Sequence, residues 1–573
     1  MIASSSASIM FGCGSNDSPG ASQNSVGGDT STGRTTTTTG GSTAQSARGG
    51  APATGGAVAT GGAVATGGQS TSLAAGGTSA VLPTGGRPAT GGAATGGNVP
   101  NAGGANPTGG KTSAGGSGVG GVGTGGAGPA TAGKSAGGGA APTGGAGPAI
   151  GGSTSVFIGT KTPGTAQTGD ITVDPTKLHQ VVDGFGEADV WQGSSSTTMQ
   201  TLLWDPVNGI GLNLVRIGIE SVSGKSVLMG NAGIADGQAC KKFSGNDCKV
   251  WAAPWSPPAA MKNNNNVNGS GNNSCANTTD TLKTDSYEAW ANLLAAFPAY
   301  YKQQSGIDLY GISAQNEPDW NPNYEACCYD KTQMVTFINT LGPKLAALSP
   351  PVTVIAAEPD NWSNFWGGDQ YAPAILADAK ASSYVGVLAT HDYGNTSAGT
   401  YARPAPPANN THHIWETECT PGDTGPITIA TMIYAAFTTG GVNGWHYWWT
   451  QAFIPNASSP PAQYYALGNY SKYVRPGYYR VDVSGAPKAS GTVPLVSAFT
   501  NLADGTVSIV VVNGGAAQQA SLFVAGTAWP ASVTPYVTTS TSKLAAGTPI
   551  AVTAGRFSAS FEAKSVTTFV GKP

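Results

Sequence analysis

Two glutamates in this chain have the surroundings that acid–base and nucleophilic chemistry require. Glu317 follows an amide, Asn316, and precedes Pro318 at the end of the apolar run 309–315. Glu418 directly follows a second such run, 413–417. A pair of carboxyl groups, one protonated and one ionised, can carry out double displacement at an acetal carbon. The pair therefore indicates cleavage of glycosidic bonds.

The two carboxyl groups divide the work through mutual repulsion. While Glu418 is negative, its charge raises the pKa of Glu317, which keeps the proton needed by the leaving oxygen. Once Glu418 carries a sugar the repulsion is gone, and Glu317 can act as the base toward water. Asn316 is placed to hydrogen-bond a sugar 2-hydroxyl. Because a proton donor and a carboxylate nucleophile suffice, we expect no metal and no organic cofactor.

These residues need a scaffold that brings together positions about 100 residues apart, or three strand–helix units of roughly 33 residues. From residue 180 onward, short apolar runs alternate with segments of helical periodicity, as in a parallel sheet of strand–helix units. Eight runs occur, at 183–188, 212–219, 250–255, 309–315, 352–357, 385–390, 413–417 and 442–449. We therefore predict an α/β fold, a (β/α)8 TIM barrel over 178–478. Its strand carboxyl ends would hold Glu317 and Glu418 about 5 to 5.5 Å apart.

The pattern changes after residue 478 to alternating residues broken by turn signals, as in 507–514 and 556–569. This alternation predicts antiparallel strands. We expect a small β-sandwich side domain made of 156–177 and 479–573, in which 170–173 adds a strand from the amino-terminal side.

The first 155 residues have a different composition. Most of the 86 glycines lie there, in repeats of Ala-Thr-Gly-Gly between 53 and 97. With almost no aromatic residue to anchor a core, 14–155 is expected to be a disordered low-complexity linker. Residues 1–13 end in Met-Phe-Gly-Cys, similar to a lipoprotein signal that lacks its positively charged start. We expect a truncated signal with Cys13 as lipid attachment point, an ordinary thiol being the alternative, and a secreted or cell-surface location.

Charge and hydropathy exclude other classes of partner. The net charge is −3 and no basic face is evident, which argues against nucleic acid. No run of about 18 apolar residues suggests a membrane span. The six further cysteines permit disulfides without fixing their pairing. The expected partner is a polysaccharide, bound by a monomer.

Several segments together resemble glycoside hydrolase family 30, within the clan of retaining (β/α)8 glycosidases. A lone Asn-Glu-Pro is weak evidence, but the ordered succession of matches is specific. The matching segments are Gly-Phe-Gly at 184–186, Leu-Val-Arg-Ile-Gly at 214–218, 251–262, Ser-Ala-Gln-Asn-Glu-Pro at 313–318, 470–477 and 565–570.

The resemblance implies roles for individual residues. Glu317 implies the acid/base, Asn316 the neighbouring sugar contact, and Glu418 the nucleophile. Glu416 is the rival nucleophile, because uniform strand alternation sends it to the same side as Glu418 at a different depth. Two further sets of residues are implied by family position: Arg216 and Tyr393, which would hold the nucleophile, and Trp255 and Trp448, which would stack on sugar rings. Arg216 could instead be a structural ion-pair partner, and His391 and His446 could be substrate contacts or structural residues.

The segment 315–327 narrows the range of expected substrates. It is similar to the corresponding segment of the bacterial endo-xylanase branch of the family. Where that branch recognises glucuronic acid side groups, it supplies an arginine after the eighth strand. Residues 450–467 contain no arginine or lysine, so no cation could pair with a uronate there. We expect an endo-β-1,4-xylanase without strict glucuronate dependence. The alternatives are endo-β-1,6-galactanase, β-1,6-glucanase, or a non-catalytic carbohydrate-binding surface protein.

Overall fold

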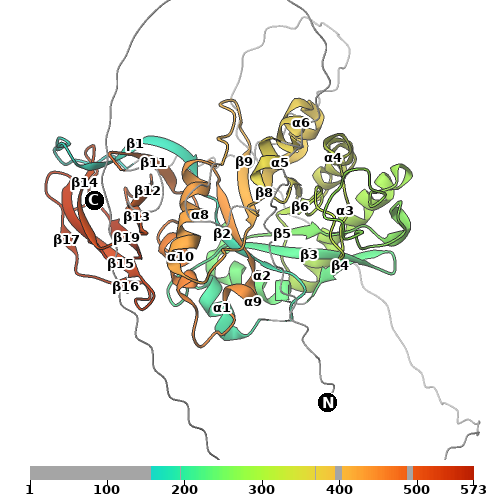
Figure 1. Ribbon diagram of the computed structural model, residues 1–573, viewed down its shortest axis with the longest axis horizontal. Helices are drawn as coiled ribbons and strands as arrows, with labels where there is room; N and C mark the ends of the chain where they lie inside the picture. The colour runs from blue at the N-terminus through green and yellow to red at the C-terminus, as the bar shows by residue number, and fades with distance from the viewer. Residues whose placement is uncertain (1–156, 194, 231, 368–369, 394–402, 487–493) are drawn as a thin grey trace, which may run out of the picture. The chain divides into compact units, whose positions relative to one another are not determined.

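The computed structural model describes residues 157–573, except 194, 231, 368–369, 394–402 and 487–493 (Figure 1). The expected signal at 1–13, Cys13 and the linker at 14–155 lie outside the described residues. In the described part, no helix is both long and apolar enough to cross a membrane.

A closed parallel barrel forms the larger part of the fold, as predicted. Its strands follow the order β2-β10-β9-β8-β7-β6-β5-β3, and pairing of β2 with β3 closes the ring. β4 extends β3 as an antiparallel hairpin. The strands are β2 (Gly184–Asp189), β3 (Leu214–Val222), β4 (Lys225–Met229), β5 (Lys249–Pro254), β6 (Gly311–Ser313), β7 (Thr353–Ala357), β8 (Val385–His391), β9 (His413–Glu418) and β10 (Gly444–Trp449).

Helices alternate with the barrel strands along the chain and pack on the outside of the barrel (Figure 1). A single large apolar cluster fills the space between the strands and these helices. The helices are α1 (Thr197–Trp204), α2 (Ala232–Ser244), α3 (Tyr287–Ser305), α4 (Lys331–Ala346), α5 (Trp362–Trp366), α6 (Tyr371–Ala377), α7 (Ala379–Tyr384), α8 (Pro426–Thr438), α9 (Thr450–Phe453) and α10 (Ala462–Ser471).

Helix α4 begins at a capping box formed by Asp330 and Gln333. Asp330 accepts hydrogen bonds from the backbone N–H groups of Thr332 and Gln333, each at 2.8 Å, and Gln333 accepts one from the Asp330 N–H at 2.9 Å. Such a cap is worth about 1 kcal/mol. Because the cap lies directly after the loop that carries Glu317, it fixes the far end of that loop.

The barrel interior is filled by large side chains below the mouth. The indole N–H of Trp251 donates to Nε2 of His446 at 3.1 Å, and the Trp415 ring lies 5.6 Å from the His446 ring. Burial lowers the pKa of His446 to about 3, so the ring is neutral and accepts that bond. Gly186 leaves room for the His446 ring, since a Cβ there would lie 2.8 Å from Cδ2 of His446. His446 is therefore a structural residue.

The carboxyl-terminal residues form a ten-stranded, mostly antiparallel sheet in the order β16-β15-β19-β13-β12-β11-β1-β14-β18, with β17 on β15. β1 comes from the amino-terminal side, pairs antiparallel with β11 and parallel with β14, and runs on to Val181, past the expected boundary at 177. The strands are β1 (Ile171–Val181), β11 (Tyr479–Ser484), β12 (Leu495–Thr500), β13 (Val507–Asn513), β14 (Gln518–Val524), β15 (Ser532–Thr538), β16 (Ala545–Ala546), β17 (Ile550–Ala551), β18 (Arg556–Phe561) and β19 (Ser565–Gly571).

This side sheet has its own apolar core and is joined to the barrel helices by specific contacts. The Asn469 amide of α10 donates to Tyr536 O at 2.9 Å and to the Thr568 hydroxyl at 3.0 Å. The Phe437 ring of α8 meets Phe499 of β12 edge-on at 5.7 Å. Barrel and side sheet therefore share an interface of packed rings and of hydrogen bonds from the Asn469 amide nitrogen.

Two disulfides tie neighbouring segments, and the sequence left their pairing open. Cys240 is bonded to Cys248, and Cys275 to Cys328. Cys327 and Cys419 are buried free thiols.

Candidate active site

Glu317 lies just beyond β6 in a backbone conformation that few residues adopt. Its φ is +43°, and Glu358, just beyond β7, has φ +59°. The Glu317 N–H donates to the Glu358 carbonyl at 3.0 Å, and the Asn316 N–H donates to the Pro254 carbonyl at 3.0 Å. Left-handed backbone in non-glycine residues costs of order 1–3 kcal/mol and persists only where neighbours enforce it. The adjoining strand ends therefore fix the direction in which Glu317 points.

Glu418 ends β9 and has donors on both carboxylate oxygens. Arg216 donates a short hydrogen bond to Oε2, and the Tyr393 hydroxyl donates to Oε1 at 2.6 Å. Arg216 also donates to Oδ1 of Asn316 at 2.5 Å. The structure thus brings together four of the residues expected at the site, and charge-assisted hydrogen bonds hold Glu418 in place.

A β-bulge separates Glu418 from Glu416, and uniform alternation does not hold in β9. Thr390 pairs with Glu416 while the next residue of β8, His391, pairs with Glu418, so Thr417 is the extra residue. The two glutamates consequently point to different sides of the strand. The expectation that they share one side was wrong, because it assumed an unbroken pleat.

Glu416 points out of the barrel into a closed set of donors. Its carboxylate accepts from the indole N–H groups of Trp362 at 2.9 Å and Trp445 at 2.6 Å, and from Arg403 Nε at 3.0 Å. Arg403 also pairs with Asp392. Glu416 is fully buried there, away from the barrel mouth, and its partners indicate a structural role.

Glu317 and Glu418 face each other across a histidine. One carboxylate oxygen of each, together with a ring nitrogen of His391, lie within 4.8 Å of one another. Nδ1 of His391 is 3.1 Å from Glu317, and Nε2 is 3.8 Å from Glu418. The separation of the two carboxyl groups is that expected for double displacement rather than for inversion through an intervening water.

The proton environments of these groups differ. Burial, opposed by His391 and reinforced by the charge of Glu418, raises the pKa of Glu317 to about 7. Burial opposes the charged form of His391, but the charges of Glu418, Glu317 and Glu358 outweigh it and raise the pKa of His391 to about 10. At neutral pH the site therefore holds an imidazolium beside a carboxyl group that is poised to lose or gain a proton.

Glu358 is a site residue that our sequence analysis missed. Its side chain is fully buried, 3.1 Å from Arg216 and 3.5 Å from His391. Burial disfavours its charge, yet the Arg216 cation and His391 lower its pKa to about 2. It directly follows the expected strand 352–357, and this position at a strand end was a signal that could have identified it.

The expected aromatic residues lie next to the carboxyl groups. Ring centroids of Trp255 and Trp448 are 6.1 Å apart, and both lie near Trp191, at 5.1 and 6.2 Å. The Arg216 guanidinium lies 4.8 Å from the Trp255 ring. Trp255 is 2% exposed whereas Trp191 is 41% exposed. Trp255 thus packs on the cation, and Trp191 presents an open face.

Glu317, His391 and Glu418 are close enough to share a metal ion. In this arrangement, however, Arg216 and Tyr393 occupy both oxygens of Glu418. The charge that an ion would neutralise is already neutralised by the guanidinium and the imidazolium.

A closed (β/α)8 barrel with two facing carboxyl groups at the carboxyl ends of its strands defines an O-glycosyl hydrolase. Residues 234–423 match the glycosyl hydrolase family 30 TIM-barrel domain. The chain is therefore similar to members of this family over its barrel.

Three proteins illustrate the relationship. Glucuronoxylanase XynC of Bacillus subtilis is 27% identical over 432 residues, which cover 73% of this chain and 95% of the relative. The family 30 subfamily 8 xylanase Xyn30A of Clostridium acetobutylicum superposes with a TM-score of 0.59 at 28% identity, covering 71% of this chain and all of that one. Endo-1,6-beta-D-glucanase neg1 of Aspergillus fumigatus is 25% identical over 425 residues, covering 62% and 83%.

Proposed function

We propose that this protein is a retaining endo-β-1,4-xylanase in which Glu317 is the general acid/base and Glu418 the nucleophile. The observation that carries the proposal is the pair itself: two carboxyl groups within 4.8 Å, one with its pKa raised to about 7, the other held by Arg216 and Tyr393. The xylanases among its relatives support the choice of substrate.

In the first step, Glu418 attacks the anomeric carbon while Glu317 gives its proton to the departing oxygen. The bond from the sugar to the leaving group breaks as the bond to Glu418 forms. Arg216 and Tyr393 fix both carboxylate oxygens, so the nucleophile meets the carbon in one orientation. Because Arg216 occupies the Asn316 oxygen, the amide N–H groups of Asn316 remain to donate to the sugar 2-hydroxyl.

In the second step, water replaces the enzyme carboxylate. Formation of the ester removes the negative charge of Glu418, which lowers the pKa of Glu317. Glu317, with His391 as its cationic neighbour, then takes the proton from water, and the product keeps the configuration of the substrate. Trp255 beneath Arg216 supports the site, while Trp191 and Trp448 offer faces for sugar rings.

We further propose that cleavage does not depend on glucuronate. The segment 450–467 after β10 carries no arginine or lysine. A uronate carboxylate bound beside this segment would lose its hydration without gaining a cationic partner. The same absence leaves β-1,6-glucan and β-1,6-galactan as the second class of substrate.

The test is to incubate the full-length chain and its Glu317→Gln variant with linear xylan, glucuronoxylan, β-1,6-galactan and β-1,6-glucan. We expect both xylans to be cut with kcat/KM values within a few-fold of each other, and the first product to retain its anomeric configuration by NMR. Cleavage of glucuronoxylan alone would contradict glucuronate independence. Cleavage of a β-1,6-glycan alone would favour the alternative enzyme, and binding without turnover a carbohydrate-binding protein.

We also propose that the enzyme is exported and acts as a monomer, tethered by a lipid at Cys13. Two disulfides support an oxidising compartment. Mass spectrometry of the membrane-bound protein should find a diacylglyceryl mass on Cys13 that Cys13→Ser lacks, and light scattering should give the monomer mass. A soluble, unmodified protein would contradict the anchor.

A further inference from the structure

Two loops beside the proposed acid/base are fastened together along their length. The first is the segment 262–282 after β5, and the second is the segment 321–328, four to eleven residues beyond Glu317. Backbone N–H groups of one loop donate to carbonyls of the other at five places. These pairs are Asn273 to Asn321 at 3.0 Å, Gly271 to Pro322 at 3.2 Å, Gly269 to Tyr324 at 2.9 Å, Ala326 to Val267 at 3.2 Å and Cys328 to Asp280 at 2.9 Å.

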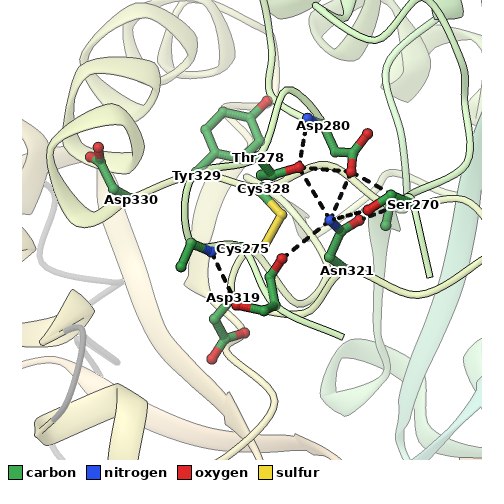
Figure 2. Close-up of a disulfide and its surroundings, with 12 residues drawn as sticks. Ser270, Cys275, Thr278, Asp280, Asp319, Asn321, Cys328, Tyr329 and Asp330 are labelled. Carbon is green, nitrogen blue, oxygen red and sulfur yellow. Dashed lines mark hydrogen bonds between the residues drawn. A yellow bond between two sulfur atoms is a disulfide. The ribbon is translucent and has the colours of Figure 1, made fainter. Parts of the chain in front are cut away.

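Asn321 is the centre of this loop pair (Figure 2). Its side chain is fully buried, and its amide nitrogen lies within 2.7 to 3.3 Å of five oxygens of the first loop. An amide nitrogen has only two hydrogens to share among them. Those oxygens are Ser270 Oγ, Asn272 Oδ1, Ser274 O, Thr278 Oγ1 and Asp280 Oδ2. Asp280 is the buried residue among these partners, and its Oδ2 also accepts from the Ser270 N–H at 3.2 Å and the Thr278 hydroxyl at 2.8 Å, so Asn321 completes a hydrogen-bond network of the first loop.

Two further links hold the same loops. The Cys275–Cys328 disulfide joins them covalently beside Asn321. Lys262 is fully buried, and its ammonium donates to carbonyls of both loops: Val267 at 3.0 Å and Ala326 at 2.5 Å. We call this assembly, made of Lys262, Asn321 and the Cys275–Cys328 disulfide, the loop clamp.

The clamp holds the backbone of Tyr324 beside the reacting groups. Tyr324 is half-buried and packs against the aromatic cluster that contains Trp255. Burial and then the charges of Glu317 and Glu418 raise the pKa of Tyr324. The side chain of Tyr324 therefore belongs to the aromatic cluster whose Trp255 ring lies 4.8 Å from the Arg216 guanidinium, which in turn holds Glu418.

We propose that Tyr324 positions the leaving-group sugar, and that the loop clamp centred on Asn321 sets its place. The inference rests on the proposed role of Glu317 as general acid. A general acid must reach the leaving-group oxygen, so its own loop borders the leaving-group half of the cleft. Tyr324 follows Glu317 on that loop. Asn321 and the disulfide act through Tyr324 and are positioning residues.

The proposal predicts different effects of the variants on two kinds of substrate. A polysaccharide must seat a sugar in the leaving-group half, whereas a dinitrophenyl glycoside has an activated leaving group that needs neither this seat nor full protonation. Removing the clamp should therefore slow cleavage of the polysaccharide and spare the aryl glycoside. A general loss of structure would lower both.

The experiment compares kcat and KM of full-length variants on xylan and on dinitrophenyl β-xylobioside. The variants are Tyr324→Ala, Asn321→Asp, which keeps the shape but brings a carboxylate to Asp280, and Cys275→Ser with Cys328→Ser. We expect kcat/KM on xylan to fall by about tenfold to a hundredfold and the aryl glycoside to change less than about threefold. The matched control removes the other disulfide, by Cys240→Ser with Cys248→Ser, and should leave the ratio of the two rates unchanged.

Equal losses on both substrates, or a wild-type ratio in Tyr324→Ala, would overturn the proposal. If Asn321→Asp fails to fold, the disulfide variant and Tyr324→Ala still decide it. If the wild-type protein does not cleave xylan, that result contradicts the proposed substrate and not the proposed role of the loop clamp. The same variants are then measured on the polysaccharide that is cleaved and on its aryl glycoside.

Discussion

The Nδ1 atom of His391 lies 3.1 Å from a carboxylate oxygen of Glu317, and the pKa of this histidine is raised to about 10. An imidazolium in this place favours the ionised form of Glu317 and so limits how far burial raises the pKa of that glutamate. The histidine thus adjusts the pKa of the proposed acid/base, Glu317.

This contact predicts the direction of a pH shift. In the wild type, kcat/KM should fall on the alkaline side near pH 7, where Glu317 loses its proton. His391→Gln removes the cation, so the pKa of Glu317 should rise and the alkaline limb should move to higher pH. A pH profile of kcat/KM for both proteins checks this. A limb that stays in place or moves to lower pH would show that His391 is not charged.

The bulge in β9 predicts different results for two neighbouring glutamates. Glu418→Ala should lose nearly all activity and, with azide and an activated glycoside, give the inverted glycosyl azide, because azide takes the place of the missing nucleophile. Glu416→Ala should give no such product. It should instead lower the free energy of unfolding by about 3–5 kcal/mol, since Arg403 loses a buried partner. Inverted azide from the Glu416 variant alone would reverse the assignment.

Removal of the Tyr393 hydroxyl should reduce activity less than removal of the Glu418 carboxylate does. Its hydroxyl donates to Glu418 at 2.6 Å, and a hydrogen bond to a charged group is worth about 1.5–3 kcal/mol. Tyr393→Phe should therefore reduce kcat/KM by about tenfold to a hundredfold, and loss of the same hydrogen bond should lower the melting temperature by a few degrees. Steady-state kinetics with calorimetry on the same sample would test both parts, and an unaltered rate would argue against a role in holding the nucleophile.

Glu358 predicts a loss of stability in acid. Its folded-state pKa of about 2 lies below the ordinary value, so its contribution is present above that value and is lost as pH falls toward 2. Glu358→Gln should be less stable than the wild type at pH 7, and the difference should shrink as pH falls from about 4.5 to 2. Urea unfolding across this range measures it. A difference that grows in acid would contradict the ion pair with Arg216.

Asp189 predicts the opposite dependence of folding stability on pH. Burial, together with the charges of Asp236 and Glu187, raises the pKa of Asp189 well above its ordinary value. The folded state therefore binds a proton that the unfolded state releases, and stability should fall as pH rises above about 4. Asp189→Asn should lose less stability between pH 5 and 9 than the wild type. Asp174→Asn, at a partly exposed position in the side sheet, is the control.

Local pattern was sufficient to predict the eight strand–helix units and two glutamates at strand ends. Periodicity is a property of neighbouring residues, and the barrel confirms it. The same reasoning placed Glu416 and Glu418 on one side, because nothing local in Trp-Glu-Thr-Glu-Cys announces a bulge at Thr417. It also passed over Glu358, whose place directly after a predicted strand was the available signal, because its partners Arg216 and His391 are distant in the sequence.

The sequence by itself determined the class of scaffold and the residues able to do chemistry, since both depend on side-chain type and spacing. Tertiary structure decided which of them act together. Only closure of the barrel brings Arg216, Glu358, His391 and Glu418 within a few ångströms, and at that distance their charges set one another's pKa values. The loop clamp has the same origin, because Asn321 meets its five oxygens only after two separate loops have packed together.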